Sequence, residues 1–110
     1  MKRYCLTLDL IDDPTLIAEY EQFHQAVWPE VLESIREAGI LNMEIYRLGA
    51  RLCMLMETED DFTFDQKSAA DAANDVVQRW EQTMWKYQKA LPEAQPGEKW
   101  LPMKQIFSLK

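Results

Sequence analysis

The chain has 110 residues and a formal net charge of −7, and its 47% apolar and 28% charged residues are typical of a globular protein. This length fits one hydrophobic core, so we expect residues 1–110 to form a single domain. The acidic excess, without any basic cluster, argues against nucleic acid or an anionic membrane as partner. No apolar run is long enough to span a membrane or to form a signal peptide, which predicts a soluble cytoplasmic protein.

The first half of the chain reads as a strand followed by an interrupted helix. Residues 3–10 alternate between the two sides of a half-buried strand. An aspartate at 12 or 13 followed by Pro14 is typical of a helix start, and apolar residues then recur at helical spacing up to Ile35. Pro29 lies inside this pattern, so we expect a kink or a break there, with the second segment ending near Gly39.

The second half predicts a hairpin, further helices and a last strand. Residues 41–48 and 51–58 alternate around Gly49 and Ala50, which is typical of an antiparallel hairpin. A short helix is expected around 62–67, and a long one opens near Asn74 and ends before Pro92. Residues 103–109 alternate again and are predicted to form the fourth strand.

The resulting order of elements is βαββαβ, which predicts an α+β class, ferredoxin-like sandwich. Such a sheet carries its helices on one face and leaves the other face bare. A chain this short gains stability by covering that face. We therefore expect a homodimer packed sheet against sheet, the arrangement of a dimeric α+β barrel.

The two cysteines, Cys5 and Cys53, are isolated and lack the CxxC spacing of metal and redox motifs. Reduced thiols are the more frequent outcome for such a pair in a cytoplasmic protein. A zinc site would require both thiols, the single histidine and a carboxylate. We therefore expect no metal site.

His24 is the single histidine of the chain and a candidate general acid or base. Tyr20 lies four residues before it on the same helix face. A histidine on an apolar face is more often a hydrogen-bonded core residue than a catalyst. The nearby tyrosine hydroxyl favours a functional interpretation, because it can hold the imidazole or a substrate oxygen.

Four tryptophans in so short a chain favour either an aromatic core or a sugar site. The core is the commoner role for any single tryptophan. In the second interpretation, the apolar face of a sugar ring packs on an indole while its hydroxyls meet polar side chains. The hairpin offers such partners in Asn42, Glu44, Tyr46 and Glu57.

The segment Glu19-Tyr20-x-x-x-His24-x-x-x-Trp28-Pro29-Glu30, with the later strand Asn42-Met43-Glu44-Ile45-Tyr46 and the pair Arg79-Trp80, resembles the L-rhamnose mutarotase family. The C-terminal stretches Met84-Trp85-Lys86-Tyr87 and Pro96-Gly97-Glu98-Lys99-Trp100 are more similar to its L-fucose mutarotase branch. The resemblance implies an isomerase with a dimeric ferredoxin-like fold. It also implies cofactor-free interconversion of the α and β anomers of a 6-deoxy-hexose, L-fucose or L-rhamnose.

Carried over by position, the family's proton donor falls on His24 and its sugar-contacting tyrosine on Tyr20. A second sugar-contacting tyrosine of the family falls on Met43, and its paired tryptophans fall on Trp80 and Glu81. These two departures disfavour L-rhamnose and make Trp85 a candidate replacement surface. The expected catalytic and substrate-binding residues are His24, Tyr20, Met43, Glu44, Tyr46, Trp80 and Trp85, with Glu44 or Glu57 as the base.

Two other functions fit the same dimeric fold, because a fold alone does not fix a reaction. One is a cofactor-free monooxygenase or haem-degrading enzyme that uses His24 and tryptophans around an aromatic or haem substrate. The other is a non-catalytic sugar-binding module.

Overall fold

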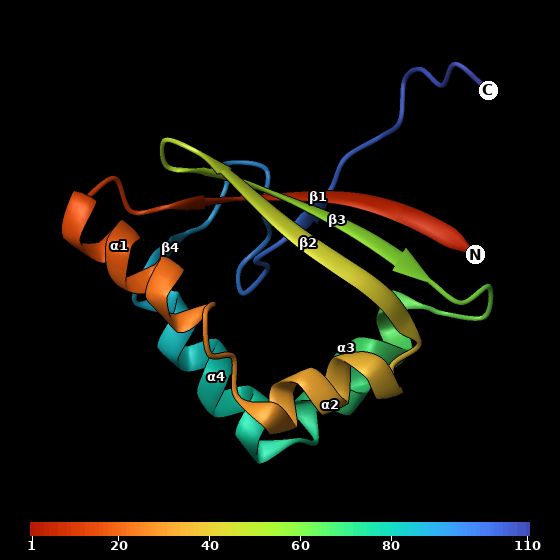
Figure 1. Cartoon of the computed structure of the whole chain (residues 1–110), viewed down its shortest axis with the longest axis horizontal. Coiled ribbons are helices and arrows are strands. Elements are labelled where there is room, and N and C mark those ends of the chain that lie inside the picture. Colours follow the sequence, from red (N-terminus) through yellow and green to blue (C-terminus); the bar gives the residue numbers. More distant parts are fainter.

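The computed structural model describes residues 1–110, and its four helices lie together on one face of an antiparallel sheet (Figure 1). The elements are β1 (Lys2–Leu10), α1 (Pro14–Phe23), α2 (Pro29–Glu37), β2 (Ile40–Leu48), β3 (Arg51–Thr58), α3 (Phe64–Ala72), α4 (Asp75–Trp85), β4 (Gln88–Lys89) and β5 (Leu101–Pro102). The strand order is β2-β3-β1-β4, with β5 also paired to β1. This is the predicted α+β ferredoxin-like arrangement. None of the helices combines the length and the apolar character needed to cross a membrane.

The helix boundaries follow local signals in the sequence. The Asp13 carboxylate accepts from the amides of Thr15 and Leu16, at 2.9 and 3.1 Å, and Pro14 is the first residue of α1. The predicted break is confirmed: α1 ends at residue 23, and α2 starts at Pro29 after an extended Trp28. The break leaves residues 24–28 free to turn beneath the sheet.

The sheet buries one face against the helices. Leu6, Leu8 and Leu10 of β1 alternate with the half-buried Cys5 and Thr7, and their neighbours on β3 are equally buried. The buried β3 residues are Leu52, Met54, Met56 and Thr58. The opposite face, which we call the outer face, carries both cysteines as free thiols with their sulfurs 3.5 Å apart.

The predicted strand at Met103–Leu109 is wrong. The partners of β1 on that side are β4 and β5, and the last pairing bond runs from the Met103 amide to the Cys5 carbonyl, at 2.7 Å. Residues 103–110 then leave the sheet as an extended arm (Figure 1). Pro102 has no N–H to offer the ladder, and the alternation that follows shows only that the arm has an apolar side. The short helix expected at 62–67 begins two residues later and continues to Ala72.

Candidate functional site

A cavity of about 690 Å³ lies between the sheet and the helix layer. Its volume is within the usual range of small-molecule sites. Most of its wall is apolar, and a few polar side chains interrupt it. The wall residues that matter below are Tyr20, His24, Met43, Trp80, Glu81, Gln88, Lys99 and Trp100.

His24 stands directly after the last turn of α1, where it caps the helix. Its Nδ1 lies 2.9 Å from the backbone carbonyl oxygen of Tyr20. Because a carbonyl oxygen only accepts, Nδ1 carries a proton, and Nε2 is the ring nitrogen left for proton exchange. The ring is half-buried against two aromatic neighbours, with centroids 4.5 Å from Tyr20 and 5.7 Å from Trp80.

Tyr20 is 3% exposed, and its hydroxyl oxygen accepts a hydrogen bond of 3.3 Å from the Gln88 side-chain amide. Burial raises the pKa of Tyr20 above its ordinary value, against a smaller opposing effect of the bond from Gln88. The hydroxyl therefore keeps its proton at neutral pH. Since the amide occupies the oxygen, that proton is available to a bound molecule.

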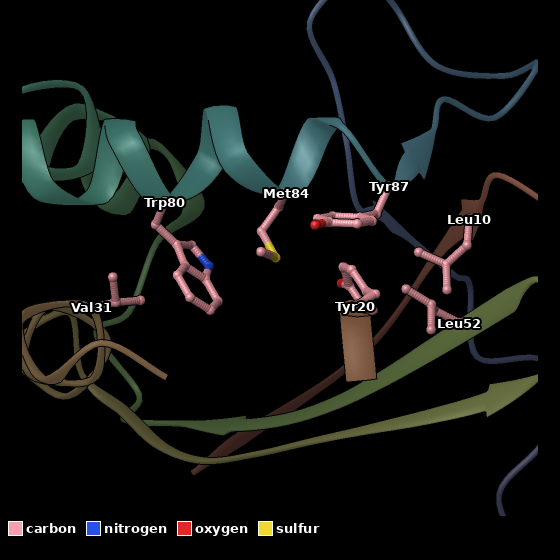
Figure 2. Close-up of a cluster of buried hydrophobic side chains, with 7 residues drawn as sticks. All are labelled: Leu10, Tyr20, Val31, Leu52, Trp80, Met84 and Tyr87. Carbon is pink, nitrogen blue, oxygen red and sulfur yellow. The ribbon is translucent and has the colours of Figure 1, made fainter. Parts of the chain in front are cut away.

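Trp80 belongs to both the core and the cavity wall. It is 9% exposed and packs edge to face on Phe23 at 6.1 Å and on Trp28 at 5.1 Å, as well as on His24. Figure 2 shows Trp80 and Met84 pointing from α4 toward the sheet, with Tyr20 beside Tyr87. The core and sugar-surface interpretations of this tryptophan are therefore compatible.

The sequence did not predict the contact between Lys99 and Glu81. The Lys99 ammonium donates to the Glu81 carbonyl oxygen at 2.7 Å and lies 3.5 Å from its carboxylate. Burial lowers the pKa of Lys99, and the nearby Glu81 offsets part of this shift. The ammonium also lies 4.8 Å from the centre of the Trp85 ring. The one available signal was that Glu81 departs from the family pattern.

The structure brings together four of the predicted site residues, Tyr20, His24, Met43 and Trp80, in one cavity wall. It does not place the other three there. Glu44 and Tyr46 lie on the outer face, where they pair across the strands with Leu55 and Cys53. The Tyr46 hydroxyl donates a hydrogen bond of 3.4 Å to the Glu44 carboxylate. Trp85 lies beneath Lys99 and outside the cavity wall.

Glu57, the other predicted base, also lies on the outer face, 3.9 Å from Arg3. Both carboxylates proposed from the sequence are therefore separated from His24 by the sheet. The carboxylates in the cavity wall are Asp71 and Glu81. No three His, Cys, Asp or Glu side chains converge as metal ligands would.

These features define a ferredoxin-like α+β domain with a cavity between its sheet and its helices that is large enough for a small molecule. The cavity combines an indole surface with a histidine, a tyrosine hydroxyl and a carboxylate. Such groups are chemically suited to a ligand that has apolar faces and hydroxyl edges, and to proton exchange with its oxygens.

Comparison with known proteins identifies the family. The family model described as L-rhamnose mutarotase matches residues 3–109. An L-fucose mutarotase of Xanthomonas campestris pv. campestris is 50% identical over 99% of this chain and 89% of its own. An L-rhamnose mutarotase of Acidiphilium cryptum is 29% identical over 88% of this chain and 89% of its own. A crystal structure of an L-rhamnose mutarotase from Formosa agariphila has the same fold, with a TM-score of 0.73 over 100% of both chains at 18% identity.

The chain belongs to the L-rhamnose mutarotase family. The predicted family and the predicted enzyme class, an isomerase of mutarotase type, are thereby confirmed.

Proposed function

We propose that this protein interconverts the α and β anomers of a 6-deoxy-hexose, with L-fucose as the preferred sugar. The observation that carries the proposal is the placement of His24, whose Nδ1 is held by a carbonyl while its ring lines an indole-walled cavity. The preference for L-fucose is supported by the higher identity to the L-fucose mutarotase than to the L-rhamnose mutarotase, 50% against 29%.

The proposed reaction needs one proton donor and one proton acceptor. Protonated His24 gives the Nε2 proton to the ring oxygen of the sugar, and the anomeric hydroxyl loses its proton to a carboxylate. The bond between the anomeric carbon and the ring oxygen breaks and leaves an open-chain aldehyde. Rotation about the adjacent carbon–carbon bond exposes the other aldehyde face, and the reverse proton transfers close the ring. Two such groups contribute typically about 10² to 10⁴-fold each.

We assign the acceptor to Glu81, because Glu44 and Glu57 lie on the outer face. Glu81 follows Trp80 on α4, and its carboxylate is held beside Lys99. Asp71, the other carboxylate in the wall, is bound to Lys67 at 2.6 Å on α3. The Lys99 ammonium, 3.5 Å away, keeps the orientation of the Glu81 carboxylate.

Exchange NMR of the anomeric protons of L-fucose and L-rhamnose tests this function. We expect catalytic amounts of the protein to accelerate α/β exchange, and more for L-fucose than for L-rhamnose. Saturation transfer from protein to sugar without faster exchange would indicate the non-catalytic sugar-binding module instead. No effect with either sugar would contradict the proposal and direct attention to haem and aromatic ligands.

We also propose that two chains form a homodimer through the outer face and the C-terminal arm. Leu55 is 42% exposed at the centre of this face, and Tyr46 is 54% exposed on β2. The arm exposes Ile106, Phe107 and Leu109 at 90, 76 and 92%. So many large apolar side chains on one small domain favour a protein partner, and a second copy offers the same surface.

Replacing Leu55 by arginine on β3 tests the dimer. We expect the wild-type protein to elute with twice the 13.0 kDa mass of one chain, and Leu55→Arg to shift it to the single mass. The reason is that two symmetry-related guanidinium groups would be buried against each other. Light scattering after size exclusion measures this, with Gln25→Arg in the exposed turn after α1 as control. A wild-type monomer, or an unaffected Leu55→Arg dimer, would contradict the proposed interface.

A further inference from the structure

Gln88 carries an unpaired buried acceptor in the cavity wall. The residue is 6% exposed, and its Nε2 donates to the Tyr20 hydroxyl. Its Oε1 is buried and has no hydrogen-bond partner. Leaving such an atom unpaired costs stability, and native proteins keep few of them without a reason.

The position does not require a glutamine for folding. Gln88 pairs with Leu10 across the β1 and β4 ladder, so both side chains lie on the helix-facing side of the sheet. Its cross-strand partner Leu10 belongs to the apolar core cluster, beside which an apolar side chain of the same length would satisfy packing. An amide at this point adds one useful bond to Tyr20 and one unpaired oxygen.

We propose that Gln88 is a substrate-binding residue whose Oε1 accepts a hydrogen bond from one sugar hydroxyl. The oxygen of the Tyr20 hydroxyl already accepts from the Gln88 amide. Its O–H donates a hydrogen bond to the oxygen of a neighbouring sugar hydroxyl. The two side chains thus present an acceptor and a donor, held together by their own hydrogen bond, to two adjacent hydroxyls of the ring. This inference rests on the proposed function for the identity of the ligand as a 6-deoxy-hexose.

The arrangement makes a prediction about selectivity. A sugar that lacks the hydroxyl facing Oε1 leaves that oxygen unpaired in the complex, so it binds more weakly than the complete sugar. An apolar residue at position 88 removes this discrimination, because there is no longer an acceptor to satisfy. A residue with only a structural role would change stability without changing which hydroxyl matters.

The experiment compares wild type with Gln88→Met, using L-fucose and its 2-, 3- and 4-deoxy analogues. We expect Gln88→Met to weaken L-fucose binding roughly tenfold, by titration calorimetry or saturation-transfer NMR. We expect one deoxy analogue to bind wild type as weakly as L-fucose binds Gln88→Met. The affinity of that analogue is expected to be the same for wild type and for Gln88→Met. The matched control is Gln78→Met on α4, because Gln78 is not a residue of the cavity wall and its side-chain amide donates to the Asp71 backbone carbonyl. We expect this substitution to leave sugar binding unchanged.

Thermal unfolding separates a binding role from a structural one. We expect the midpoint for Gln88→Met to stay close to that of wild type, since the substitution removes an unpaired buried acceptor together with the bond to Tyr20. Unchanged sugar binding, or an equal loss for all analogues, would overturn the inference, as would a wild type that binds none of these sugars. If wild type binds the sugar without accelerating anomer exchange while Gln88→Met loses binding, the proposed function fails and the role of Gln88 stands.

Discussion

Replacing His24 by alanine is expected to slow anomer exchange by about 10² to 10⁴-fold while the protein remains folded. The imidazole is the group in the cavity wall with a ring nitrogen left for proton exchange, because its other nitrogen is held by the Tyr20 carbonyl. Alanine also keeps the backbone of the helix end, so the cap formed by residue 24 survives. The measurement is exchange NMR of the anomeric protons at saturating sugar.

Two comparisons make this prediction specific. Gln25→Ala, at the exposed neighbouring position, is expected to leave the exchange rate unchanged. Binding of the sugar to His24→Ala, followed by saturation transfer, should persist because the indole and hydroxyl contacts remain. A His24→Ala protein that keeps both its fold and its full exchange rate would remove histidine from the mechanism and leave Glu81 without its partner.

The parts of the fold that were predictable from the sequence are those determined within a few residues. Asp13 and Pro14 start a helix, Pro29 breaks one, and the turn at residues 49 and 50 joins two strands. Each of these features depends on the backbone conformation and hydrogen bonds of adjacent residues. The last strand depended on an edge of β1 that lies about a hundred residues away in sequence. Alternation in 103–109 describes the surface of that segment and carries no information about where it pairs.

The candidate site shows the same division. Tyr20 and His24 were found together because a spacing of four residues at a helix end fixes their proximity. For the hairpin, alternation separated Met43 from Glu44 and Tyr46 without saying which set faces the helices. Core packing decides this, since Met43 lies opposite the buried Met56.

Gln88 and Lys99 could not be predicted as site residues from local patterns. Gln88 reaches the cavity because β4 pairs with β1, and Lys99 reaches it because the loop after Pro92 returns the chain to α4. Both are long-range contacts made by the C-terminal segment, whose two strands, β4 and β5, have only two residues each. A polar residue of this kind is recognised only in the structure, where one of its buried polar atoms lacks a hydrogen-bond partner.

The second large effect concerns the core beneath the site. Leu52→Ala on β3 is expected to lower the free energy of unfolding by about 3 to 5 kcal/mol, because the side chain is 1% exposed and packs in the cluster with Leu10 and Tyr20 (Figure 2). Total stability of small domains is about 5 to 15 kcal/mol, so this loss is a large share of it. Urea unfolding at one fixed protein concentration measures the change.

Leu48→Ala is the matched control, since it removes the same atoms from a leucine that is 84% exposed at the end of β2. We expect it to change the free energy of unfolding by less than about 0.5 kcal/mol. Equal losses for the two variants would mean that the helix-facing side of the sheet is not the main core. A large loss in Leu52→Ala alone would also predict weaker sugar binding. The void that the substitution leaves in the core loosens the packing that holds Tyr20 against Gln88. We therefore expect stability and sugar binding to depend on the same layer of side chains.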